Sequence, residues 1–152
     1  MTVYRHFGAS RFDLSHQYPG QGQLHPIGVK PGWGLWASPV GDNFFTWEEW
    51  CRDNDWDLGQ LDRHFDFTLD PTAKVLTLTT MDELSNSGVF YSADMRSPRI
   101  AWWLDLGSYL TLGYDAIYVS AMTCRDLYWA LYGWDCDSIC VTNPAVVREV
   151  AS

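Results

Sequence analysis

The stretch FDFTLDPTAKVLTLT, residues 65–79, contains the clearest strand pattern in the chain. Apolar and polar residues alternate along Phe65–Leu69, and less regularly along Val75–Thr79. Alternation with a period of two is typical of strands that bury one face. The dipeptide Asp70-Pro71 stands between the two runs and is typical of a turn. The sequence therefore predicts an antiparallel pair of strands that reverses direction at Asp70-Pro71.

Strands are also expected on both sides of this stretch, from their content of β-branched and aromatic residues. The segments concerned are residues 2–6, 34–37, 114–120 and 138–142. Residues 17–34 are rich in glycine and proline and read as a loop. The apolar run 100–106 is ambiguous between strand and helix.

Helices are predicted at three places. Thr46 with Glu49, and Thr80 with Glu83, are capping boxes that begin helices after each threonine. Pro144 predicts the start of a C-terminal helix. Because strands outnumber helices and do not alternate with them regularly, the expected fold class is α+β.

The size of the chain fits one domain covering residues 1–152, with a mass of 17.4 kDa. A hydrophobic content of 47% and a charged content of 19% exclude a disordered or collagen-like chain. No run approaches the roughly 18 apolar residues that a transmembrane helix needs. The segment Met1–His6 contains no apolar signal region. We therefore expect a cytoplasmic protein with no membrane association.

The net charge is −9, from ten Lys and Arg against nineteen Asp and Glu. This excess of acid argues against nucleic acid as a partner, because a grip on its backbone needs many cationic contacts. The charge is unevenly distributed, since residues 1–41 carry Arg5, Arg11 and Lys30 against Asp13 alone, a local charge of +2. A small anionic ligand would be attracted most strongly to this first quarter of the chain.

The sequence predicts no metal site. None of the four cysteines forms a CxxC pair of the kind that binds zinc, so buried reduced thiols are expected at Cys51, Cys124, Cys136 and Cys140. Residues 53–57 begin like a calcium loop, but Leu58 replaces the turn glycine and His64 replaces the bidentate glutamate.

Aromatic residues are unusually frequent, with nine tryptophans in the chain. Most such rings belong to cores or partner surfaces. Four of them, Trp33, Trp36, Trp47 and Trp50, nonetheless lie close together in sequence, beside the cationic first quarter. Rings next to glycines and positive charge suit a flat heteroaromatic ligand that carries phosphates.

Three motifs resemble those of the ADP-ribosyltransferase superfamily, in the same order along the chain. Tyr4–Ser10 resembles the first-strand motif, in which a His or Arg ends the strand before a glycine turn. Gly34–Ser38 resembles the second strand, and Thr46–Cys51 resembles the helix that follows it. The third motif is a carboxylate that enters a late strand, and Asp137 before Ile139-Cys140-Val141 is similar to it.

The resemblance implies an ADP-ribosyltransferase-like split β-sandwich of mainly antiparallel strands around an NAD cleft, with short helices. It implies transfer of ADP-ribose from NAD, used as a substrate, to a macromolecular acceptor with release of nicotinamide. Protein is favoured as the acceptor over nucleic acid because of the acidic charge. The small size is similar to that of phage or bacterial effectors.

The resemblance also implies a set of site residues. His6 is the expected residue at the end of the first strand, with Arg5 as the alternative, because a strand alternates its faces and both cannot point into the cleft. The other NAD-binding residues implied are Gly8, Ser10, Trp36, Thr46 and Trp50. Asp137 is implied as the catalytic carboxylate, because a fixed carboxylate stabilises the oxocarbenium-like cation that forms when the glycosidic bond breaks.

Several alternatives remain open. Asp135 and Asp115 also precede strands and compete with Asp137 for the role of the key carboxylate. Thr46 is already explained as a helix cap. A second hypothesis is a non-catalytic, acidic and tryptophan-rich module that binds a partner on the same scaffold and has no affinity for NAD.

Overall fold

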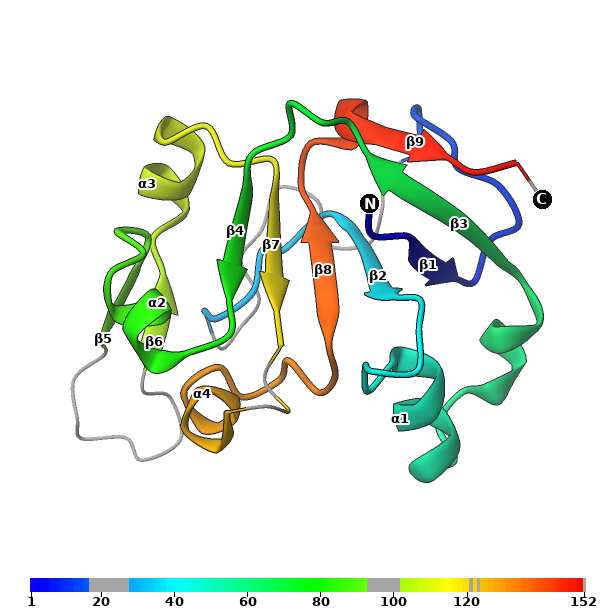
Figure 1. Ribbon diagram of the computed structural model, residues 1–152, viewed down its shortest axis with the longest axis horizontal. Helices are drawn as coiled ribbons and strands as arrows, with labels where there is room; N and C mark the ends of the chain where they lie inside the picture. The colour runs from blue at the N-terminus through cyan, green and yellow to red at the C-terminus, as the bar shows by residue number, and fades with distance from the viewer. Residues whose placement is uncertain (17–27, 93–101, 121, 123, 152) are drawn as a thin grey trace.

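The computed structural model describes residues 1–16, 28–92, 102–120, 122 and 124–151, and Figure 1 shows its arrangement. The predicted loop over residues 17–27, and residues 100 and 101 of the ambiguous run, lie outside the described residues. Nine strands are described: β1 Tyr4–Phe7, β2 Leu35–Pro39, β3 His64–Leu69, β4 Val75–Leu78, β5 Phe90–Ser92, β6 Trp102–Leu104, β7 Ala116–Val119, β8 Ser138–Val141 and β9 Val147–Glu149. The described helices are α1 Trp47–Asp53, α2 Met81–Ser85, α3 Leu106–Thr111 and α4 Arg125–Ala130, with 3-10 turns at η1 Leu58–Asp62 and η3 Pro144–Val146.

The strands form a seven-stranded sheet in the order β4-β7-β8-β2-β1-β3-β9 and a separate pair, β5-β6. Every described ladder is antiparallel except the one between β4 and β7. The predicted α+β class is therefore confirmed. The ladder between β1 and β2 is the shortest, with two residue pairs, Tyr4↔Pro39 and Arg5↔Ser38. It joins β4-β7-β8-β2 on one side to β1-β3-β9 on the other (Figure 1).

The predicted antiparallel pair at residues 65–79 is wrong. β3 pairs with β1 and β9, whereas β4 pairs in parallel with β7 at the opposite edge of the sheet. The physical reason lies at the start of β4, where the Asp115 amide donates to the Lys74 carbonyl at 2.8 Å. The Asp115 carboxylate in turn accepts from the Lys74 amide at 2.7 Å. These two bonds hold β4 beside β7, so the turn after β3 does not close a hairpin.

The two faces of the sheet belong to two separate cores. One core packs Leu76, Leu78, Ile117 and Val119 against α2, α3, α4 and the β5-β6 pair. The other packs Leu35, Phe65, Phe67, Ile139 and Val147 on the side of β3 and β9. The two alternating runs of residues 65–79 thus bury their side chains in different cores, which a hairpin would have placed together.

The two predicted capping boxes are both confirmed. The Thr46 hydroxyl accepts from the Glu49 amide while the Glu49 carboxylate accepts from the Thr46 amide, and α1 begins there. Thr80 and Glu83 make the same reciprocal bonds at the start of α2. These contacts satisfy amide groups that the first turn of a helix leaves without partners.

The predicted C-terminal helix is wrong. Pro144 does begin a helical turn, but η3 ends at Val146 and the chain continues as strand β9. β9 pairs with β3 over three residues, from Phe67↔Glu149 to Leu69↔Val147. Burial of Val146 and Val147 in the second core gives more apolar contact than one more exposed helical turn would.

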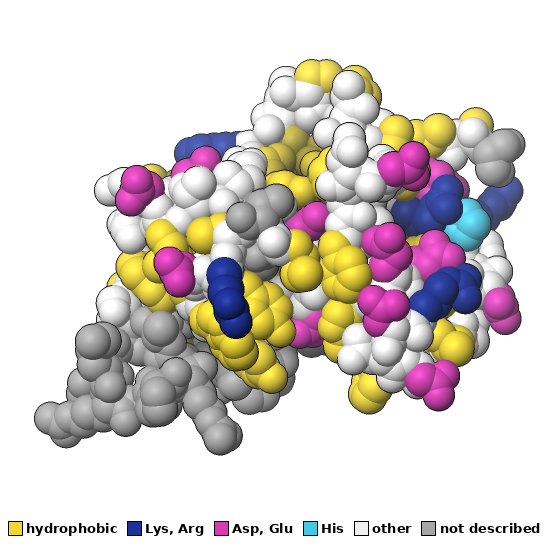
Figure 2. Space-filling view, turned by 60° about the horizontal axis from the view of Figure 1, so that its bottom comes forward, with side chains coloured by type: hydrophobic (Ala, Val, Ile, Leu, Met, Phe, Trp, Pro, Cys, Tyr) yellow, Lys and Arg dark blue, Asp and Glu magenta, His cyan; other side chains and the backbone are white. Residues whose placement is uncertain are grey.

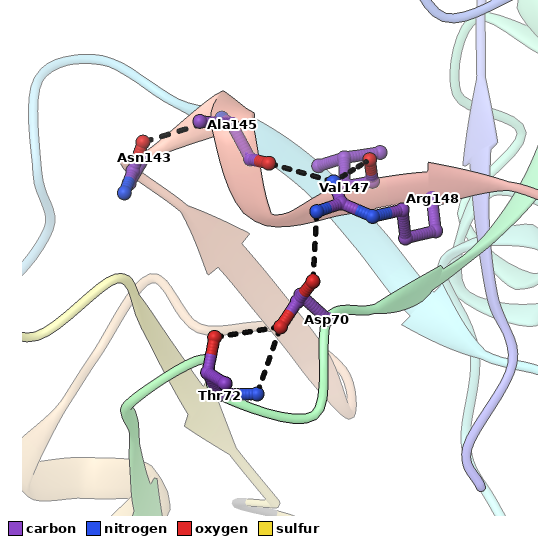
Figure 3. Close-up of polar contacts among 6 residues, drawn as sticks. All are labelled: Asp70, Thr72, Asn143, Ala145, Val147 and Arg148. Atoms are coloured by element: carbon purple, nitrogen blue, oxygen red, sulfur yellow. Dashed lines mark hydrogen bonds and ion pairs between the residues drawn. The ribbon is translucent and has the colours of Figure 1, made fainter.

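A group of polar contacts at Asp70 fixes the C-terminal strand (Figure 3). One oxygen of the Asp70 carboxylate accepts from the amide and hydroxyl of Thr72, and the other accepts from Arg148 Nη2 at 2.7 Å. Arg148 Nη1 donates to the carbonyls of Ala145 and Val147. The guanidinium therefore links the turn after β3, the 3-10 turn and β9.

Within the described residues, every helix falls short of the length and apolar character that a membrane crossing requires.

The first testable prediction concerns Arg148. Replacement by methionine keeps an unbranched apolar stem and removes the guanidinium with all its hydrogen bonds, so we expect faster amide hydrogen exchange in β9 and in the facing part of β3. Exchange in β7 and β8 should not change. Arg63→Met is the control, because Arg63 is exposed and its side chain makes no hydrogen bond or ion pair with the described residues. Equal exchange in the Arg148→Met variant and the unmodified protein would contradict the role of this contact.

Candidate functional site

A pocket of about 320 Å³ lies on the face of the sheet formed by β1, β2 and β8. Arg5 is paired with Ser38 in the β1–β2 ladder, and Trp36 with Cys140 in the β2–β8 ladder. Directly paired residues project on the same face of a sheet, so these side chains form a common floor. Pockets of this size are typical of small-molecule sites.

The walls of the pocket come from segments that are distant in sequence. Trp47 of α1 and Gln60 of η1 form one wall, and their side chains are joined by a hydrogen bond of 3.2 Å from Trp47 Nε1 to Gln60 Oε1. Gly133–Cys136, which connects α4 to β8, forms the opposite wall. Lys30 completes the lining from the segment before β2.

A second, more polar hollow of about 220 Å³ adjoins the first. Arg5, Phe7 and Ser38 line both hollows, so they form the boundary between them. Thr46 and Glu48 line only the second. The two hollows therefore adjoin at Arg5.

Arg5 is on the floor of the site and forms an ion pair with Asp66. Its Nε and Nη2 atoms donate to the two carboxylate oxygens at 2.7 and 2.8 Å. The hydrogen bond from Arg5 lowers the pKa of Asp66, and burial opposes this shift. The same contact raises the pKa of Arg5, so both groups are charged at neutral pH. The guanidinium is thereby held at the junction of the two hollows.

His6 projects on the other face of β1, where it is paired with Phe65 and its ring lies 5.2 Å from the Phe65 ring. It nevertheless borders the larger pocket, and its Nδ1 atom lies 2.7 Å from the Trp36 carbonyl. Since a carbonyl only accepts, Nδ1 carries the proton. Burial lowers the pKa of His6, and the bond to the carbonyl partly opposes this.

Trp36 lines the pocket as expected, but its ring is already in contact with two neighbours. The Trp134 ring lies 4.8 Å away at a tilt of 57°, and Lys30 Nζ lies 5.2 Å from the Trp36 ring centroid. Trp134 is itself buried, and its Nε1 donates to the Val29 carbonyl at 3.0 Å. Trp36 is therefore a fixed part of the floor.

Trp50 lies behind the wall rather than on it. Its ring stacks on Trp47 with centroids 4.9 Å apart and planes 7° from parallel, and Trp56 meets it edge-on. Trp47 is the ring that lines the pocket. Trp47 and Trp50 are three residues apart and so share one face of α1, but this spacing does not indicate which of the two rings borders the pocket.

Two expected residues of the first motif are outside the pocket. Gly8 has a φ of +100° and donates its amide to the Arg63 carbonyl, which closes the turn after β1. Ser10 is exposed. Neither is among the residues that line either hollow.

The three candidate carboxylates have different places. Asp135 lines the pocket, half-buried, and burial raises its pKa while the Lys30 charge opposes this. Asp137 is buried and does not line either hollow: its oxygens accept from the Phe45 amide and the Ser120 hydroxyl, both at 3.0 Å. Asp115 accepts from the Lys74 amide and from Asn143 at the far end of the sheet. Asp135 is thus the carboxylate in the pocket.

Aromatic side chains are also exposed on α4 and just after it, next to the pocket wall. Trp129 and Tyr132 are 56% and 51% exposed, and their rings are parallel to within 2°. Figure 2 shows hydrophobic side chains gathered over α4, and acidic side chains more frequent on the side of α1.

No group of His, Cys, Asp and Glu that could hold a metal is found among the described residues. All four cysteines are free thiols, and Cys124 is only partly buried whereas the other three are buried.

Comparison with known proteins finds no matching family model, no similar curated protein and no similar solved structure. The residues of the pocket are therefore the basis for the functional proposal.

The second prediction concerns His6. Because burial lowers the pKa of His6, the unfolded chain binds a proton at pH values where the folded protein does not. The free energy of unfolding should therefore decrease as pH falls below about 6.5, the ordinary pKa of histidine. Urea unfolding at pH 7 and pH 5.5 measures this difference, which His6→Gln should reduce. An unchanged difference in the His6→Gln variant would contradict the assignment.

The third prediction concerns Asp137. Asp137→Ala removes both acceptor oxygens, so the Phe45 amide and the Ser120 hydroxyl lose this partner. We expect a loss of about 1–3 kcal/mol in the free energy of unfolding. Urea unfolding at pH 7 is the measurement, and Asp126→Ala, at an exposed carboxylate, is the control. A loss of activity with unchanged stability would instead assign Asp137 a direct chemical role.

Proposed function

We propose that the protein is an NAD-dependent mono-ADP-ribosyltransferase, which transfers ADP-ribose to a macromolecular acceptor and releases nicotinamide. The observation that carries the proposal is the convergence of three distant segments on one pocket. Arg5 and His6, Trp36, and Asp135 line it together. These residues come from, or lie next to, the three motifs that resemble the ADP-ribosyltransferase superfamily.

The shape of the site supports a dinucleotide as the substrate. NAD has two heteroaromatic halves joined by a pyrophosphate, and the two adjoining hollows offer one compartment to each half. Arg5 at the boundary is a cation near the centre of such a ligand. The short β1–β2 ladder, which divides the sheet into two parts, supports the finer expectation of a split β-sandwich around this site.

Each pocket residue has a role in the proposed mechanism. Trp47, backed by Trp50, offers the flat wall for the nicotinamide ring. Asp135 stabilises the positive charge that develops on the ribose as the glycosidic bond breaks. The bonding electron pair leaves with nicotinamide, which departs as a neutral molecule. The acceptor nucleophile then bonds to the ribose carbon and loses its proton.

The roles differ from the first expectation at two points. Asp135 takes the role expected of Asp137, because the carboxylate of Asp137 is occupied by two hydrogen bonds away from the pocket. Trp47 takes the stacking role expected of Trp36 and Trp50. Thr46 borders the smaller hollow, and its hydroxyl serves as the helix cap.

A second candidate function, a partner-binding module without catalysis, is favoured by exposed apolar side chains on α4 and on either side of it. Trp129, Tyr132 and Met122 are each at least half exposed. A surface of this kind is typical of protein contacts. The two functions differ in their affinity for NAD, which only the transferase requires.

The fourth prediction tests the transferase. Millimolar NAD should raise the melting temperature by several degrees, since a ligand at 100 times its dissociation constant adds about 2.7 kcal/mol to stability. Nicotinamide should be released on incubation, and Asp135→Asn should slow the release by about 100-fold or more while the fold is kept.

Asp126→Asn, an exposed carboxylate of α4, is the matched control and should release nicotinamide at the unmodified rate. Absence of both the thermal shift and nicotinamide release would overturn the transferase and favour the binding module. A full rate in the Asp135→Asn variant would remove Asp135 from the mechanism.

A further inference from the structure

Lys30 is the one cation of the larger pocket that the expected site did not include. Its backbone is firmly placed, because the neighbouring Val29 is buried in the first core and its carbonyl accepts from Trp134 Nε1 at 3.0 Å. The Gly28 carbonyl accepts from the Leu104 amide at 2.7 Å. Lys30 therefore extends into the pocket from a fixed segment, with its ammonium group 5.2 Å from the Trp36 ring centroid.

The ammonium group of Lys30 has unused hydrogen-bonding capacity. An ammonium carries three donors. Among the described residues Lys30 makes no hydrogen bond and no ion pair, and its ammonium group lies over the ring of Trp36. Asp135 acts on it electrostatically but lies beyond ion-pair distance. Burial lowers the pKa of Lys30, so an anion beside it would stabilise its charged form.

Arg5, the other cation of the pocket, differs from Lys30 because it already donates to a carboxylate. Two of the nitrogens of Arg5 are held by both oxygens of Asp66. A phosphate at Arg5 would have to share the guanidinium with that carboxylate, whereas a phosphate at Lys30 would meet donors with no competing acceptor in contact. Charge-assisted hydrogen bonds of this type are strong and directional.

We propose that Lys30 is the phosphate-binding residue of the pocket, and that its ammonium group selects phosphorylated nucleotides over the corresponding nucleosides. The proposal rests on the transferase function for the identity of the ligand. It extends that function by assigning a residue to the anionic part of the substrate.

The charge of Asp135 also affects a phosphate bound at Lys30. A carboxylate within electrostatic range of Lys30 repels a phosphate bound there. Asp135→Asn should therefore strengthen phosphate binding while it slows nicotinamide release. A residue that contributed only to packing would not produce opposite effects on binding and on turnover.

The fifth prediction is tested by calorimetric titration with three probes: nicotinamide mononucleotide, nicotinamide riboside and inorganic pyrophosphate. The unmodified protein should bind the mononucleotide at least tenfold more tightly than the riboside. Lys30→Met should weaken binding of the mononucleotide and of pyrophosphate about tenfold or more, as expected for one lost charge-assisted hydrogen bond, and leave the riboside unchanged. Asp135→Asn should strengthen binding of the mononucleotide.

Lys74→Met is the matched control. Lys74 also lies over an aromatic ring, 4.5 Å from the Tyr114 centroid, but its ammonium donates to the Leu112 carbonyl outside the pocket. Binding of all three probes should be unchanged in this variant. Lys30→Gln replaces Lys30→Met if the methionine variant does not fold, and Lys30→Arg should retain most of the affinity.

Three results would overturn the proposal: equal affinity of the unmodified protein for mononucleotide and riboside, unchanged mononucleotide affinity in the Lys30→Met variant, or no binding of mononucleotide and pyrophosphate at millimolar concentration. Failure of the transferase is distinguishable from these results. Binding of the mononucleotide that depends on Lys30, without nicotinamide release from NAD, would retain the phosphate site and overturn the enzyme.

Discussion

The buried carboxylate of Asp137 holds together the parts of the molecule that form the pocket. Its oxygens accept from the Phe45 amide, just before α1, and from the Ser120 hydroxyl, just after β7. The Asp137 amide donates to the Phe45 carbonyl at 2.8 Å. Both walls of the pocket depend on this group, because α1 follows Phe45 and Gly133–Cys136 leads into Asp137. A buried carboxylate is stable only when hydrogen-bond donors surround it. Asp137 therefore needs these donors, and the segments that carry the donors are held in place by Asp137.

Ser38 extends this constraint to the floor of the pocket. Its hydroxyl accepts from the Trp47 amide at 2.8 Å, which fixes the first residue of α1 above β2. Trp47 then carries Trp50 on its outer side in a parallel stack. The aromatic wall is thus oriented by one short polar side chain and supported by a second ring. A preorganised wall of this kind lowers the entropy lost when a flat ligand binds.

The sequence predicted local features well and long-range pairing poorly. The capping boxes at Thr46 and Thr80 depend on residues three apart, so they are readable from the sequence alone. The position of β4 depends on contacts between Lys74 and Asp115, which are 41 residues apart, and no local pattern indicates them. The last strand, β9, likewise depends on burial of Val146 and Val147 against β3, which outweighs the helical start at Pro144.

In the candidate site, too, the sequence predicted residues within local motifs but not the contacts between distant segments. Arg5, His6 and Trp36 were expected from motifs and do border the pocket. The choice between Asp135 and Asp137 could not be made, because residues two apart share a face only within a regular strand and β8 begins after both. Lys30 and Trp134 carry no motif and come to the pocket through the bond between the Trp134 indole and the Val29 carbonyl. Only the folded chain places them together.

The net negative charge of the protein makes a cation inside the pocket, such as Lys30, important for binding an anion. A protein of net charge −9 repels an anionic nucleotide at long range, so a binding site needs cations concentrated where the ligand enters. Arg5 is partly neutralised by Asp66, whereas Lys30 keeps its charge available inside a half-enclosed pocket, where charges are less screened than at the surface. For the proposed transferase, the net negative charge would favour a basic protein surface over nucleic acid as the acceptor. One region of positive potential within an acidic molecule is thus consistent with a small anionic substrate inside and a basic macromolecular partner outside.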